Sequence, residues 1–246
     1  MKIEGEFRSE KDPRFRKVII FMNTKKLLLA AVCVVFLATS AAFALPSPIS
    51  VTGTNSDGEP LSATADFAFT DTSLTLTLTN NVSAADFRSA GQLLSDFSFT
   101  LSGGTLTSLT SISGNAIDIA LDGTTSPGTP VSSTDWQLSS NNGTFLLTAL
   151  FHAQPDYMII GGVSGDTYSL ANASITHGMF DPFLQTSATF TLSGAGLTGA
   201  TITGATFSFG TGPETFISTP DSGSTLMLLG LAMIGLAAIC AKFQKA

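Results

Sequence analysis

A regular alternation of apolar and hydroxyl side chains constrains the fold of this chain more than any other feature. In residues 74–79 every leucine is followed by a threonine. Successive side chains of a β-strand point to opposite faces, so this pattern makes one face apolar and the other polar. It predicts half-buried antiparallel strands. The same alternation recurs around Phe67 and Phe69, around Phe97, Phe99 and Leu101, from Ile117 to Leu121, and from Phe145 to Phe151.

Turn residues interrupt these segments at intervals typical of hairpin loops. The interruptions are Asp71-Thr72-Ser73, Ser102-Gly103-Gly104, Asp122-Gly123, Asn141-Asn142-Gly143 and Gly161-Gly162. Only residues 83–94 favour a helix, with Ser83 and Asp86 as a capping box. We therefore predict one all-β domain of about ten short strands in two packed sheets, a jelly-roll-like antiparallel β-sandwich. Most of the 19 phenylalanines should lie inside it.

Charge is distributed unevenly along the chain. The interval from residue 45 to residue 221 holds 14 acidic residues and one basic residue, Arg88, so its net charge is −13. A surface this acidic repels phosphate, which excludes nucleic acid as a partner and favours metal cations or neutral sugars. Because neither Cys33 nor Cys240 falls in this interval, the domain must be stabilised by its core without disulfides.

Residues 22–44 have the three parts of a secretory signal peptide. A lysine pair precedes an apolar run at residues 27–37, and the segment ends with Ala42 and Ala44 in an Ala-x-Ala arrangement. These small side chains suit the narrow pockets of a signal peptidase. We expect cleavage before Leu45.

The C-terminal region contains a second apolar run, 16 residues without charge from Leu226 to Ala241, flanked by Lys242 and Lys245. As a helix it would be about 24 Å long, close to the hydrocarbon thickness of a bilayer. The lysines should remain on the cytoplasmic side. The run predicts a transmembrane helix that holds a precursor in the inner membrane during transit.

A short motif of proline and acid, Pro220-Asp221-Ser222-Gly223, stands just before this run. Motif, apolar helix and basic end together resemble the PEP-CTERM sorting signal, in its VPDSG variant, of bacterial exosortase substrates. The differences are Thr219 in place of valine and a basic tail of only two lysines. The resemblance covers residues 219–246. It implies Sec export, temporary retention by the helix, recognition of the motif residues by a membrane-embedded exosortase, and release or re-anchoring at the outer surface.

These signals divide the chain into four expected parts. Residues 1–21 are densely charged and form an extension that translation from Met22 would omit. The signal peptide at 22–44 and a Thr- and Gly-rich β-domain at 45–218 follow, and 219–246 is the sorting signal. We expect a non-enzymatic exported protein, first a membrane-anchored precursor and then an envelope or extracellular-matrix protein. Its expected partners are signal peptidase, exosortase and exopolysaccharide.

Few residues of the domain are arranged for binding or catalysis. Asp57 and Glu59, in an oxygen-rich loop too short for an EF-hand, are the candidate ligands for calcium, and no other cofactor is expected. His152 and His177 lack a second ligand at metal spacing, so a shared zinc site would require the fold to join them. The segment at 194–199 matches G-x-G-x-x-G, but a strand-like segment follows, which predicts a turn.

Two other functions stay open. A carbohydrate-binding module on the same scaffold would present a stacking platform of Trp136, Tyr157 or Tyr168. A secreted hydrolase would need a nucleophile elbow or paired carboxylates. Residues 162–166 lack the second glycine of an elbow, and the only glutamates of the domain lie in predicted loops.

Overall fold

The computed structural model describes residues 45, 47–212 and 215–219. The chain divides into two compact units, Met1–Ala42 and Phe43–Ala246, and every described residue belongs to the second. The described residues include no helix with the length and apolar character needed to cross a bilayer. Several predicted features lie outside the described residues: the extension at 1–21, the signal peptide with Ala42 and Ala44, the apolar run at 226–241, and Pro220, Asp221, Ser222 and Gly223.

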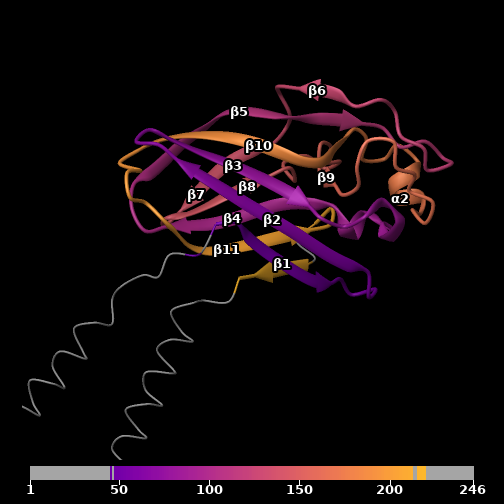
Figure 1. Cartoon of the computed structure of the whole chain (residues 1–246), viewed down its shortest axis with the longest axis horizontal. Helices are drawn as coiled ribbons and strands as arrows, with labels where there is room; N and C mark the ends of the chain where they lie inside the picture. The colour runs from indigo at the N-terminus through magenta and orange to yellow at the C-terminus, as the bar shows by residue number, and fades with distance from the viewer. Residues whose placement is uncertain (1–44, 46, 213–214, 220–246) are drawn as a thin grey trace, which may run out of the picture. The chain divides into compact units, whose positions relative to one another are not determined.

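The described part of the second unit consists mainly of β-strands (Figure 1), which confirms the all-β prediction. The helical elements are η1 (Ala84–Asp86), η2 (Ala90–Gln92) and α2 (Ala173–Thr176). The strands are β1 (Ile49–Thr54), β2 (Pro60–Phe69), β3 (Ser73–Asn80), β4 (Leu94–Leu101), β5 (Thr105–Ile117), β6 (Thr129–Val131), β7 (Gln137–Asn141), β8 (Thr144–Thr148), β9 (Ile159–Ile160), β10 (Phe183–Ala195), β11 (Ile202–Phe209) and β12 (Thr215–Ser218).

The strands form two antiparallel groups that one short strand connects. The first group runs β1-β2-β3-β10-β5-β6 and the second β12-β11-β4-β8-β7. Strand β9 pairs with β10 through Ile159 and Ile160, and with β4 through Ile159 alone. Because both isoleucines are buried, their peptide groups need partners, and these pairings make all twelve strands one hydrogen-bonded sheet. The prediction had two packed sheets, and at this junction β9 joins them into one.

The apolar faces of the two groups pack against each other, which gives the domain a sandwich-like arrangement. The ring of Phe67 on β2 lies 5.9 Å from that of Phe97 and 6.2 Å from that of Phe99, both on β4. Phe97 also lies 4.8 Å from Phe207 on β11. The leucines of β3 are fully buried, as the alternation at 74–79 predicted. The other fully buried phenylalanines are Phe87, Phe183, Phe190 and Phe209.

Hydroxyl side chains of neighbouring strands pair with each other on the outer faces. The hydroxyls of Thr77 on β3 and Thr189 on β10 lie 3.0 Å apart. On the other group, Thr206 of β11 and Ser218 of β12 also lie 3.0 Å apart. Such cross-strand pairs stabilise a sheet without adding charge to it.

Two predicted strands end earlier than the alternation suggested. Strand β5 ends at Ile117, and beyond it Ile119 makes only an isolated bridge, while Leu121 is 73% exposed. Strand β8 ends at Thr148, and Phe151 is 61% exposed. In both places the chain enters a surface loop, so Leu121 and Phe151 do not pack against the core.

The helix predicted over residues 83–94 is instead the two short turns η1 and η2. The Ser83 hydroxyl donates to the Asp86 carboxylate at 2.7 Å and caps no backbone group. The capping box lies at Ser89 and Gln92, at the start of η2. Gln92 is fully buried and donates to the Pro60 carbonyl at 2.9 Å, so tertiary contacts override the local helix preference.

A buried asparagine forms hydrogen bonds at the junction where β9 connects the two groups of strands. The side-chain amide of Asn80, at the end of β3, donates to the carbonyls of Gln92 at 2.8 Å and Ile159 at 3.0 Å. Its carbonyl accepts the Val82 amide at 3.1 Å. Gly161, two residues after Ile159, lies so close to the backbone of Val82 that an added Cβ would be 1.9 Å from the Val82 carbonyl oxygen.

Candidate functional site

A cleft lies between the loop after β5 and the segment that follows α2, with a volume of about 950 Å³. The buried Tyr168 anchors this loop, because its amide donates to the Gly123 carbonyl at 2.9 Å. Gly123 has φ +80°, and a Cβ there would lie 2.7 Å from the Tyr168 oxygen. The ionisable residues that line the cleft are Asp118, Asp122, His177 and Asp181.

The carboxylates of this cleft differ in acidity. The pKa of Asp181 is raised to about 6, mainly by partial burial and secondly by the negative charge of Asp118. A hydrogen bond from the Ile119 backbone has the opposite effect and lowers this pKa. Asp181 Oδ1 is buried without a hydrogen-bond partner among the described residues. The hydroxyl and amide of Thr124 lower the pKa of the exposed Asp122. The cleft is therefore lined by one carboxyl with a pKa of about 6, Asp181, and by one with a lowered pKa, Asp122.

We expect Asp181→Asn to stabilise the protein at pH 8 and to weaken its pH dependence. The pKa of Asp181 is higher in the folded state than the ordinary 3.8, so the folded protein binds this proton more tightly. The stability contributed by this group therefore falls as pH rises from about 4 through 6, and the full cost is present at pH 8. After screening of the partly exposed carboxyl, we expect a gain of about 1 kcal/mol.

Urea unfolding at pH 5 and pH 8 measures this effect. Asp122→Asn is the matched control, because it removes a carboxylate of the same cleft whose pKa is lowered. The control should not gain stability at pH 8. Equal pH dependence in Asp181→Asn and the unmodified protein would contradict the assignment.

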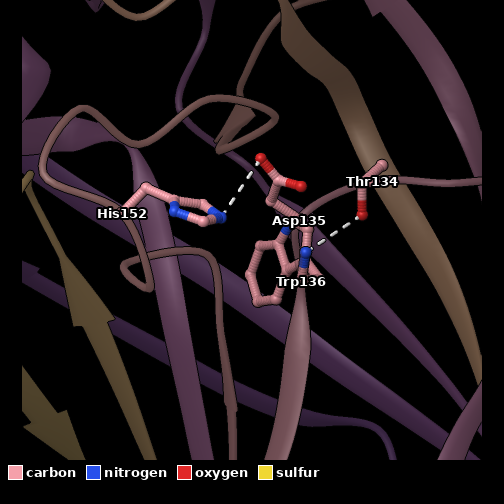
Figure 2. Close-up of polar contacts among 4 residues, drawn as sticks. All are labelled: Thr134, Asp135, Trp136 and His152. Carbon is pink, nitrogen blue, oxygen red and sulfur yellow. Dashed lines mark hydrogen bonds and ion pairs between the residues drawn. The ribbon is translucent and has the colours of Figure 1, made fainter.

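The two histidines lie in different surroundings. Figure 2 shows the ring of His152 directed at Asp135, with Nε2 3.7 Å from Oδ2; both side chains are about half exposed. Partial burial and the neighbouring Asp135 raise the pKa of Asp156. His177 lies in the cleft with Asp181. Within residues 47–212 and 215–219, no three His, Cys, Asp or Glu residues are arranged to hold a metal ion.

The predicted calcium loop is the turn between β1 and β2. The Asn55 side-chain oxygen accepts the amides of Asp57 at 3.1 Å and Glu59 at 2.9 Å. The Glu59 carboxylate accepts from the Asn55 amide at 2.7 Å and from the Ser89 hydroxyl at 2.5 Å. Glu59 thus links this hairpin to Ser89, the N-cap residue of η2. Calcium binding at Asp57 and Glu59 stays a prediction.

Of the three rings predicted for an aromatic platform, Trp136 and Tyr168 are buried and Tyr157 is half-buried. Trp136 is 3% exposed, packs 4.9 Å from Phe190 and donates through Nε1 to the Tyr157 carbonyl at 2.8 Å. Tyr168 is 1% exposed, and its hydroxyl donates to the Gly161 carbonyl at 2.5 Å. Because both polar atoms have acceptors inside the domain, these rings serve the core and offer no stacking surface to a sugar.

In the glycine-rich segment at 194–199, the first two residues end β10 and residues 196–199 form the predicted turn. Strand β10 ends at Ala195 and β11 begins at Ile202, and Gly196 and Gly199 have φ +67° and +74°. A strand follows the segment, so it has no helix N-terminus that could bind a pyrophosphate.

Both ends of the described chain donate a backbone hydrogen bond to β11. The amide of Leu45 donates to the Ile202 carbonyl at 2.7 Å, and its side chain packs against the core. The amide of Thr219 donates to the Ala205 carbonyl at 3.0 Å. The residue after the predicted signal-peptide cleavage and the first residue of the predicted sorting signal at 219–246 therefore both donate hydrogen bonds to one strand. No family model, curated protein or solved structure matches the chain.

Proposed function

We propose that this chain is a non-enzymatic exported protein whose β-domain reaches the cell surface through a C-terminal signal read by an exosortase. Signal peptidase releases the N-terminus, and the apolar run at 226–241 holds the precursor in the inner membrane. The exosortase then recognises Pro220, Asp221, Ser222 and Gly223. The mature product is an envelope or matrix protein in contact with exopolysaccharide.

The observation that carries this proposal is the way the domain begins and ends. Leu45, which follows the predicted signal peptide, and Thr219, the first residue of the predicted sorting signal, both donate backbone hydrogen bonds to β11. Removal of both signals would therefore leave every strand from β1 to β12 in the mature product. Between residues 45 and 221 the sequence has 14 acidic residues and one basic residue, Arg88, and this charge suits a neutral matrix better than an anionic one.

The finer class of the fold belongs to the same proposal. We describe the domain as a single jelly-roll-like β-sandwich, supported by the packing of Phe67 against Phe97 and Phe99 across the two strand groups. A stable core of this kind, without disulfides, suits a protein displayed outside the cell.

Pro220→Ala combined with Asp221→Ala is expected to leave a full-length precursor in the membrane when the cognate exosortase is present. The double variant removes the proline, a residue type that disfavours helix for the residue before it, and the charge that an enzyme would recognise. Immunoblots of membrane and released fractions measure the outcome. The matched control, Pro130→Ala with Asp135→Ala, alters the same residue types inside the domain and should mature normally. Normal maturation of the motif variant would leave only a plain C-terminal anchor.

A further inference from the structure

The cleft between the loop after β5 and the segment after α2 has a wall that internal hydrogen bonds hold in place. Residues 118–126 fold back on themselves, because the Ser126 amide donates to the Asp118 carbonyl at 2.9 Å and the Ser126 hydroxyl accepts the Asp118 amide at 2.8 Å. Residues 176–181 form the facing wall. With a volume of about 950 Å³, the cleft is comparable with the largely pre-formed sites that bind small molecules.

The polar groups of this cleft are mainly hydrogen-bond acceptors without a cation beside them. Partial burial first, and the charge of Asp118 second, raise the pKa of Asp181, so the two carboxyls lie close enough to interact. Oδ1 of Asp181 is buried and has no donor among the described residues. Neither Lys nor Arg lines the cleft. Acceptors in this state favour a ligand that brings hydrogen-bond donors. The hydroxyl side chains of the lining are Thr124, Thr125, Ser126 and Thr176.

Charge and geometry narrow the class of ligand. The three carboxyls of the lining repel an anion. A calcium ion takes six to eight oxygen ligands, and in the part of the chain that the structure describes no three His, Cys, Asp or Glu residues are arranged around a metal. A neutral polyol meets neither objection. Each of its hydroxyls can donate to a carboxylate and accept from a serine or threonine hydroxyl.

An exposed apolar side chain lies among these polar groups. Leu121 lines the cleft and is 73% exposed, whereas Ile119, two residues earlier, is buried. A sugar ring has C–H faces as well as hydroxyls, and such a face would remove the Leu121 side chain from water. A bare metal ion has no apolar surface to pack there. The combination of carboxylates, hydroxyls and one exposed leucine therefore fits a sugar.

We propose that this cleft binds a neutral saccharide. Asp118 and Asp181 accept hydrogen bonds from its hydroxyls, and Leu121 packs against the C–H face of a ring. The inference rests on the proposed function, since it names the site and the ligand class through which the domain contacts exopolysaccharide. It needs no aromatic platform, so the burial of Trp136 and Tyr168 does not oppose it.

Titration calorimetry on the full chain, in a zwitterionic detergent that carries no sugar, tests the proposal. The probes are neutral oligosaccharides of glucose, mannose and galactose, with calcium chloride and spermidine as cationic probes. We expect a neutral probe to bind, and Asp118→Asn to weaken its binding about tenfold through loss of a charged acceptor. The matched control is Asp86→Asn, which removes an exposed carboxylate of η1 outside the cleft and should bind as the unmodified chain does.

Leu121→Ala distinguishes a sugar from a cation. It should weaken sugar binding about fivefold through loss of buried apolar surface, whereas a metal ion would bind equally well to both forms. Leu170→Ala is its control, because Leu170 is 49% exposed and does not line the cleft. Lack of binding by every neutral probe, whatever the cationic probes do, would overturn the proposal. Sugar binding that neither Asp118→Asn nor Leu121→Ala weakens would overturn it as well.

The assay involves neither export nor processing, so the two proposals fail separately. If no neutral probe binds while the Pro220→Ala/Asp221→Ala variant stays in the membrane, only the saccharide site is wrong. If that variant matures normally while a neutral probe binds in the cleft, only the sorting proposal is wrong.

Discussion

Phe97→Ala is expected to lower the free energy of unfolding by about 4 kcal/mol. Phe97 is fully buried where the two strand groups meet, with its ring 5.9 Å from Phe67, 5.5 Å from Phe99 and 4.8 Å from Phe207. Truncation removes the ring and leaves a cavity between three aromatic neighbours, which cannot all collapse into it because each is held by its own strand.

Urea unfolding monitored by circular dichroism measures this loss. Phe151→Ala provides the matched control, because Phe151 is 61% exposed in a loop, and its truncation should change stability by no more than about 0.5 kcal/mol. Equal effects of the two substitutions would show that the facing groups of strands do not share a packed core.

Asn80→Ala is expected to destabilise the protein by about 3 kcal/mol. The substitution leaves the carbonyls of Gln92 and Ile159 and the amide of Val82 without their side-chain partner in a site where Asn80 itself is 1% exposed. Each unsatisfied buried group retains its desolvation cost, since water has no access to replace the lost hydrogen bond.

Asn81→Ala is the control for this site, one residue further along the chain. Asn81 is exposed, and its side chain donates only to the Thr64 hydroxyl, at 2.8 Å. We expect its loss to cost less than about 1 kcal/mol in the same urea experiment. A loss for Asn80→Ala no larger than that of Asn81→Ala would mean that the β9 junction does not depend on this side chain.

The strands with clear alternation could be predicted from the sequence because a single rule determines which way each side chain points. In β3 the leucines are buried and the threonines between them are partly exposed. The turn at Asn142 and Gly143 joins β7 and β8 as its sequence suggests, with φ +49° and +80°. The rule fails where a strand is too short to alternate, as in β9, whose two side chains are both buried although successive residues of a strand point to opposite faces.

The polar clusters could not be predicted, because they depend on contacts between distant segments. His152 lies near Asp156 in sequence, yet its ring contacts Asp135, which comes from the loop before β7. Asp181 is perturbed by Asp118, 63 positions earlier by their numbering in the chain. The burial of Trp136 and Tyr168 depends likewise on internal acceptors, the carbonyls of Tyr157 and Gly161.

The identity of the two termini of the mature protein tests the sorting account most directly. Mass spectrometry of the protein recovered from the cell surface or medium should give a chain that starts at Leu45 and lacks the apolar run at 226–241 with its two lysines. A surface protein that begins at Met1 or Met22, or that still ends at Ala246, would contradict it.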